Sequence, residues 1–160
     1  MIIDNEKARR VLEALEKKKL TLGSVESLTG GLFASTLTSV PGASKVFKGS
    51  LVTYWSEEKI ALADVSATSI RDYGVVSQKV ANEMAKGGKR RLNVDVCVSF
   101  TGNAGPTSEP GSAPIGRVNM AIATPWGRVQ MQQDFTLTRN EIREACVDMM
   151  LDQLIAIFQD

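Results

Sequence analysis

Residues 94–100 read Val-Asp-Val-Cys-Val-Ser-Phe, and residues 101–116 after them read Thr-Gly-Asn-Ala-Gly-Pro-Thr-Ser-Glu-Pro-Gly-Ser-Ala-Pro-Ile-Gly. A short run rich in valine that stops at glycine and proline is typical of a buried strand leading into a loop. Two more strand-like runs, 117–123 and 128–135, flank Thr-Pro-Trp-Gly at 124–127, and this pattern predicts a hairpin. The second half of the chain is therefore expected to supply three strands.

The first half of the chain alternates strands with helices. Strands are expected at 20–26 and 48–55. Helices are expected at 5–19, within 27–40 after a glycine-rich turn, from 56 onward, and at 67–73, 78–91 and 140–158. Interleaved strands and helices followed by a late hairpin indicate an α/β fold. We expect a three-layer α/β/α sandwich with a mixed β-sheet, formed as a single domain over residues 1–160.

The overall composition excludes several classes of protein. The 160 residues carry a net charge of +1, with the charges scattered, so no general binding to nucleic acid is expected. The N-terminal segment is too charged for a signal peptide, and no apolar run reaches membrane length. We therefore expect a cytoplasmic protein that contacts no membrane, with Cys97 and Cys146 as reduced core thiols.

The chain has no histidine, and this absence limits its chemistry strongly. A Ser-His-Asp triad, a Cys-His pair and a histidine-ligated metal are excluded within one chain. The two cysteines are not closely spaced, so we expect no metal and no cofactor. Any proton transfer has to use lysine, tyrosine, a carboxyl group, cysteine or water.

The first candidate element, Glu26-Ser27-Leu28-Thr29-Gly30-Gly31, spans the expected junction between a strand and a helix. Its two glycines allow a tight turn and a close approach of the backbone to a ligand. Free N–H groups at a helix start can hold an anion, either a phosphate or an oxyanion, and a serine beside them is placed to attack. The alternative is that Ser27 is a plain helix cap, because serine favours that position.

Tyr54 and Lys59 form a second candidate element. If Ser56 caps the next helix, Lys59 lies in its first turn, where the positive end of the helix lowers the pKa of a lysine. A lysine that is partly neutral can deprotonate a serine, although Glu57 and Glu58 oppose this effect if they lie close. The alternative is an exposed surface lysine.

Two further groups complete the candidates. Thr101, Gly102 and Gly105 belong to the loop after the central strand, where small residues permit close contact with a ligand or simply form a structural turn. Arg139 and Arg143 are four residues apart and share one helix face. There they either grip a phosphate or carboxylate, or are solvated.

Six segments of the chain form an ordered set. They are Glu-Ser-Leu-Thr-Gly-Gly at 26–31, Val-Thr-Tyr-Trp-Ser-Glu-Glu-Lys at 52–59, Gly-Val-Val-Ser at 74–77, Thr-Gly-Asn-Ala-Gly-Pro at 101–106, Ala-Pro-Ile-Gly at 113–116 and Thr-Arg-Asn-Glu-Ile-Arg at 138–143. In order and spacing this set resembles the CinA C-terminal domain family, in its stand-alone form, over most of the chain. Any one segment is a weak signal, but the ordered set is specific.

The resemblance implies an amidohydrolase that converts nicotinamide mononucleotide to nicotinic acid mononucleotide and ammonia. By motif, it implies that Ser27 is the nucleophile, that Lys59 is its base, and that Tyr54 orients them or relays a proton between them. The expected partner is a small nucleotide substrate, and a homo-oligomer stays open. The expected substrate-binding residues are Glu26, Thr29, Gly30, Gly31, Gly49, Ser50, Thr101, Gly102, Gly105, Arg139 and Arg143.

The sequence also departs from the family pattern. Leu28 replaces a cysteine, Trp55-Ser56 replaces Ser-Asn, Ala113 replaces a lysine and Thr138 replaces an aspartate. The changes at 113 and 138 would weaken phosphate binding, and the bulk of Trp55 could block the pocket or displace Lys59. The alternative function is therefore a catalytically silent paralogue with a binding or regulatory role connected with competence or DNA damage.

Overall fold

The computed structural model describes residues 5–160, and its centre is one mixed sheet of five strands in the order β2-β1-β3-β4-β5. The strands are β1 Leu22–Glu26, β2 Phe47–Val52, β3 Val96–Gly102, β4 Arg117–Thr124 and β5 Gly127–Asp134. β1 runs parallel to β2 and β3, whereas β4 is antiparallel to both of its neighbours. The predicted hairpin and mixed sheet are confirmed. Residues 1–4 of the expected domain lie outside the described part.

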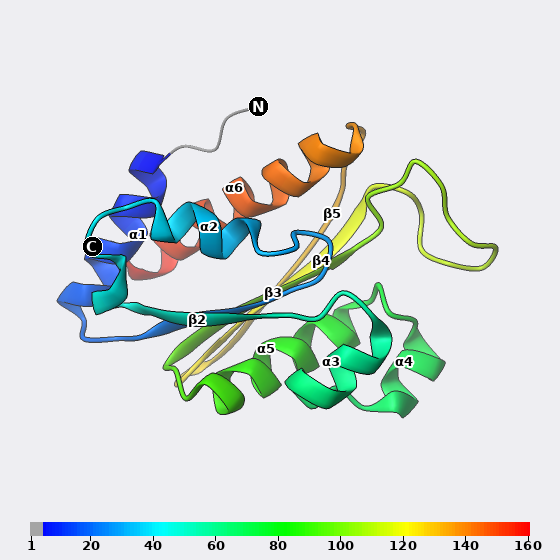
Figure 1. The fold of residues 1–160 in the computed structure, drawn as a ribbon, viewed down its shortest axis with the longest axis horizontal. Coiled ribbons are helices and arrows are strands. Elements are labelled where there is room, and N and C mark those ends of the chain that lie inside the picture. The colour runs from blue at the N-terminus through cyan, green and yellow to red at the C-terminus, as the bar shows by residue number, and fades with distance from the viewer. Residues whose placement is uncertain (1–4) are drawn as a thin grey trace.

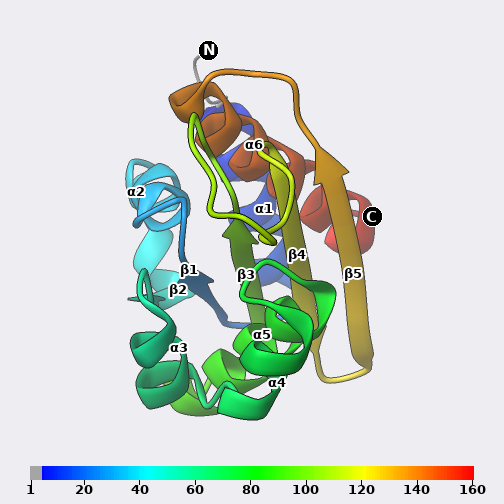
Figure 2. The ribbon, with the colours of Figure 1, turned by 90° about the vertical axis from the view of Figure 1, so that its right-hand side faces the viewer.

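Helices cover both faces of the sheet (Figures 1 and 2). One face carries α1 Asn5–Lys17, α2 Leu32–Thr38 and α6 Arg139–Phe158, and the short 3-10 helix η1 Ala43–Lys45 leads into β2. The other face carries α3 Ser56–Ala63, α4 Ala67–Tyr73 and α5 Gln78–Leu92. The predicted three-layer α/β/α sandwich is therefore confirmed.

The central strands are apolar because both of their faces are covered. Val98 and Phe100 of β3 pack in the core under α1, α2 and α6. Cys97 of the same strand points the other way and packs with Val25 and Met84 in the core under α5. A strand buried on both faces reads as a nearly continuous apolar run, and this is the pattern of residues 94–100.

Two adjacent glycines in α5 let it approach its neighbours closely. A Cβ atom added to Gly87 would lie 1.7 Å from the carbonyl oxygen of Ala63 at the end of α3. A Cβ atom added to Gly88 would lie 2.3 Å from a methyl group of Val25 in β1. Because α3 carries Lys59 and β1 leads to Ser27, this contact sets the spacing between the two elements that bear the candidate catalytic residues.

Some predicted element ends were wrong. β2 ends at Val52, although the sequence pattern extended the strand to residue 55. Thr53 still donates its N–H to Glu26 O (2.8 Å), but Trp55 is the N-cap of α3, so the chain turns away from the sheet there. The first helix ends at Lys17 rather than residue 19. Within residues 5–160, no helix has the length and apolar character needed to cross a membrane.

Candidate active site

Ser27 lies in a tight turn directly after β1. Its N–H donates to Phe100 O of β3 (3.1 Å), and its carbonyl accepts the N–H of Gly30 (3.0 Å). Gly30 and Gly31 have φ angles of 57° and 103°, a region that glycine enters without a steric penalty. The helix α2 begins only at Leu32, with Gly31 as its N-cap, so the alternative that Ser27 is a helix cap is wrong.

Glu26 supplies the negative charge at the start of α2. Its fully buried carboxylate accepts the N–H groups of Phe33 (2.9 Å) and Ala34 (3.1 Å) and the hydroxyls of Ser24 (3.1 Å) and Ser50 (2.9 Å). The expectation that this helix start offers free N–H groups to a ligand anion is therefore wrong, because two of them already bind Glu26. The contacts tie β1, β2 and α2 together around the serine turn.

Lys59 points from α3 to Ser27, and its amine lies 2.9 Å from the Ser27 Oγ. Only 1% of Lys59 is exposed, so the alternative of a surface lysine is wrong. Burial lowers the pKa of Lys59 to about 8. The sequence argument placed the cause of such a shift in the field of the helix, but removal of the ammonium group from water is the principal cause.

The surroundings of the Lys59 amine suit a neutral base. Besides Ser27, the amine donates to the carbonyl oxygens of Thr53 (2.7 Å) and Tyr54 (3.2 Å). A neutral amine has two N–H donors and one lone pair. If the two carbonyls take the two donors, the lone pair faces the Ser27 hydroxyl, which then donates to it. The same three oxygens also satisfy the three donors of the ammonium form.

The hydroxyl group of Tyr54 contacts Arg139 rather than the other two candidate catalytic residues. It accepts a hydrogen bond from Arg139 Nη2 (2.9 Å), while Arg139 Nη1 donates to Gly105 O (2.7 Å). The hydrogen bond between Tyr54 and Lys59 uses the backbone carbonyl of Tyr54. Arg139 therefore connects the start of α6, the tyrosine and the 101–106 loop.

Arg143 contacts the backbone of the serine turn. Its guanidinium donates from Nε to Leu28 O (2.8 Å) and from Nη2 to Thr29 O (3.1 Å). The two arginines share a helix face as expected, but they serve different parts of the site. Because Arg143 donates to two successive backbone carbonyls after Ser27, it helps to position the turn. Its contact with substrate stays a prediction.

Ser27, Lys59 and Tyr54 open into a small well with a volume of about 210 Å³. Of the predicted site residues, Thr101, Gly102 and Arg139 also line this well. The other predicted substrate-binding residues lie outside its lining: Glu26, Thr29, Gly30, Gly31, Gly49, Ser50, Gly105 and Arg143. The well thus contains the candidate catalytic residues but only part of the expected binding set.

Six lining residues were not predicted: Leu28, Ser56, Val75, Val76, Asn103 and Ala104. All six lie within the quoted motifs. The motifs therefore located the lining of the well better than the individual residues that were predicted within them. We expected that the bulk of Trp55 could block the pocket or displace Lys59, but Trp55 is 68% exposed and does not line the well. Its neighbours Tyr54 and Ser56 face the well instead.

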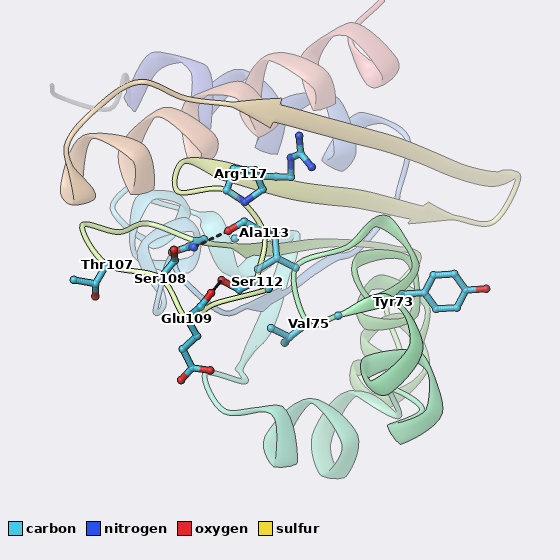
Figure 3. Close-up of a pocket in the computed structure, with 14 residues that line it drawn as sticks. Tyr73, Val75, Thr107, Ser108, Glu109, Ser112, Ala113 and Arg117 are labelled. Carbon is cyan, nitrogen blue, oxygen red and sulfur yellow. Dashed lines mark hydrogen bonds between the residues drawn. The ribbon is translucent and has the colours of Figure 1, made fainter.

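A larger hollow adjoins the well (Figure 3). Its volume is about 870 Å³, and it lies between the 103–117 loop and the segment around Val75. Val75, Val76, Gly102 and Asn103 line both cavities, so a ligand that reaches Ser27 can extend into the hollow.

Known proteins are similar to this chain in sequence and fold. The family model described as the CinA C-terminal domain matches residues 4–158. The chain belongs to the CinA C-terminal domain family. The CinA-like protein of Flavobacterium psychrophilum is 39% identical over 140 residues, which are 88% of this chain and 34% of that protein. The CinA-like protein of Petrotoga mobilis is 42% identical over 134 residues, or 84% of this chain and 33% of its own length.

Solved CinA-type structures match nearly the whole length of the chain. The competence/damage inducible protein CihA from Agrobacterium tumefaciens has a TM-score of 0.92 and 32% identity, with 99% of both chains covered. A CinA superfamily protein from Escherichia coli has a TM-score of 0.90 and 28% identity, with 98% of this chain and 94% of that chain covered. The chain nevertheless spans only about a third of the length of the curated relatives that it matches.

Proposed function

We propose that this CinA-type chain is an amidohydrolase that converts nicotinamide mononucleotide to nicotinic acid mononucleotide and ammonia. The observation that carries the proposal is the 2.9 Å contact between the Ser27 Oγ and the Lys59 amine inside the well. A serine beside a buried lysine of lowered pKa is an activated nucleophile that needs no histidine. The choice of substrate rests on the family resemblance of the motifs that surround these residues.

The proposed reaction begins with attack of the Ser27 Oγ on the carboxamide carbon. The Ser27 proton moves to the neutral Lys59 amine as the Oγ–C bond forms and the carbonyl oxygen becomes an oxyanion. Lys59 then gives this proton to the amide nitrogen, the C–N bond breaks, and ammonia leaves an acyl-serine. Water repeats the sequence: it loses a proton to Lys59, attacks the ester, and Ser27 recovers its proton from the lysine.

Two backbone N–H groups are candidates to stabilise the oxyanion. Leu28 and Ala104 both line the well, and their N–H groups have no hydrogen-bond acceptor within residues 5–160. Leu28 follows the nucleophile directly, and Ala104 belongs to the loop after β3. Donors that are already oriented toward a developing negative charge stabilise the transition state without reorganisation.

The size of the well is consistent with a flat aromatic carboxamide. With a volume of about 210 Å³, it has room for a pyridine ring and its amide but not for a whole nucleotide. The sugar and phosphate then have to lie in the adjoining hollow or in solvent. Lys59 and Ser27 are almost fully buried, at 1% and 8% exposure, so the protein shields both reacting groups from bulk solvent.

The deciding experiment is ammonia release from saturating nicotinamide mononucleotide, with Ser27→Ala as the matched control. The substitution removes one hydroxyl, so the variant is expected to keep the thermal midpoint of the wild type and to lose turnover. Equal rates for the two proteins, with no calorimetric signal for nucleotide binding, would refute the amidase proposal. That result would support the silent-paralogue alternative instead.

A further inference from the structure

The hollow beside the well differs from a typical phosphate site in its charge. Its wall includes the hydroxyl-bearing residues Thr107, Ser108 and Ser112 and the carboxylate of Glu109. Figure 3 shows these residues along one loop, with Val75 across from them and the ring of Tyr73 turned away. Among the residues that line the hollow, Arg117 carries the one positive charge.

Arg117 is already paired with a carboxylate. Its Nε and Nη2 donate to the two carboxylate oxygens of Asp134, at 2.8 and 3.0 Å. A bidentate pair of this kind occupies the Nε/Nη2 edge, which a guanidinium can otherwise offer to a phosphate. With Arg117 neutralised and Glu109 present, the lining carries a net negative charge, which repels a phosphate.

The remaining polar groups suit an uncharged ligand. The hydroxyls of Thr107 and Ser108 have no hydrogen-bond partner within residues 5–160, so both can donate to and accept from a ligand hydroxyl. Asn103 holds the loop at its base, since its side-chain amide donates to Ala113 O (3.0 Å) and its side-chain oxygen accepts the N–H of Gly105 (3.2 Å). The hollow thus offers free hydroxyl groups on a loop that Asn103 holds in place by hydrogen bonds.

We propose that this hollow binds the uncharged, hydroxyl-bearing part of the substrate, the ribose of a pyridine nucleotide, and that a phosphate on that sugar adds little to recognition. The inference rests on the proposed amidase function. Two observations support it: the well and the hollow share lining residues, so a ligand held in the well can extend into the hollow, and Arg139 lines only the well. A sugar phosphate in the hollow therefore meets no free cation of its lining.

The test compares kcat/KM for ammonia release from nicotinamide riboside and from nicotinamide mononucleotide at physiological ionic strength. We expect the nucleotide to be preferred by less than about tenfold, because the one cation in the lining of the hollow is already paired with Asp134. Ala113 lines the hollow, so Ala113→Lys adds a cation to its wall. This variant should raise the nucleotide-to-riboside ratio at least about tenfold, whereas the uncharged Ala113→Gln should not change it.

Other outcomes overturn the inference. A wild-type preference for the nucleotide above about tenfold would do so, and loss of that preference in Arg139→Gln would assign the phosphate to Arg139. An unchanged ratio in Ala113→Lys would show that the ligand does not pass this wall. If neither compound releases ammonia above the Ser27→Ala rate, the proposed function fails separately. The inference is then decided by the calorimetric affinities of Ser27→Ala for the two compounds. A preference for the nucleotide below about tenfold supports it, whereas a larger preference overturns it. If neither compound binds, the inference is also overturned.

Discussion

The well and the hollow share part of their walls, yet they differ in burial, charge and hydrogen bonding. In the well, Lys59 and Ser27 are almost fully buried, and the amine contacts three oxygens. In the hollow, the lining from Thr107 to Ser112 is exposed, and its one cation is paired outside the cavity. Burial lowers the pKa of Lys59 in the well, whereas the segment from Thr107 to Ser112 in the hollow is exposed to solvent. Under the proposed function, the well carries the chemistry and the hollow carries the recognition of the sugar.

The largest effect on activity is expected from replacing the buried Lys59. If Lys59 proves dispensable, the well does not differ from the hollow in the way proposed. Lys59→Arg keeps a positive charge but cannot become neutral, so kcat should fall at least about a thousandfold, as for other residues that activate a nucleophile. Single-turnover ammonia release measures the effect. Because arginine is larger, Lys59→Met is the second variant and should be equally inactive. The control is Glu58→Gln, an exposed change on the same helix, which should keep wild-type turnover. Substantial activity in a folded Lys59→Arg protein would remove Lys59 from the mechanism.

The position of Ser27 should depend on Arg143, although we expect Arg143 itself not to contact the ligand. Arg143→Gln removes two hydrogen bonds to the turn, at Leu28 and Thr29. We expect kcat to fall about ten- to a hundredfold with a smaller change in KM, because a small displacement of the nucleophile is costly. The exposed Arg128→Gln is the control. A rise in KM at unchanged kcat would show instead that Arg143 binds substrate.

The burial of Lys59 predicts a dependence on pH. The pKa of Lys59 is lowered to about 8, so kcat/KM should rise about tenfold from pH 7 to a plateau above pH 9. The unfolded chain, with a lysine pKa near 10.5, binds more protons than the folded chain between pH 8 and 10.5. The contribution of Lys59 to the free energy of unfolding therefore rises with pH across this window. A flat rate profile from pH 6 to 9, measured with buffer controls, would contradict the prediction.

The smallest effect is expected in the hollow. Glu109→Gln removes its carboxylate but keeps its shape, and Glu109 is exposed. The change in kcat/KM for nicotinamide mononucleotide should be less than about fivefold, because screened surface charges contribute up to about 1 kcal/mol. Any change should be an increase in kcat/KM for the nucleotide, because the substitution removes a negative charge from the lining. A loss of more than a hundredfold would place Glu109 in the chemistry and erase the distinction between the two cavities.

The sequence predicted the layers of the fold more reliably than the ends of its elements. Runs such as residues 94–100 and the Thr-Pro-Trp-Gly hairpin depend on local periodicity and turn residues, which act over a few positions. The end of β2 at Val52 was missed because the chain leaves the sheet to start α3, and this depends on where α3 packs. The glycine pair at 87–88 likewise acquires its meaning only from the close approach of Ala63 and Val25.

For the candidate site, the sequence by itself determined which chemistry was open. The absence of histidine, the Ser27 turn and the presence of Lys59 can be read without coordinates, because they concern residue types and local spacing. The tertiary structure alone decided that Lys59 is buried against Ser27, that Glu26 and Arg143 hold the turn, and that Tyr54 faces Arg139. These contacts join residues far apart in the chain, and the pKa of Lys59 follows from the water that such packing excludes.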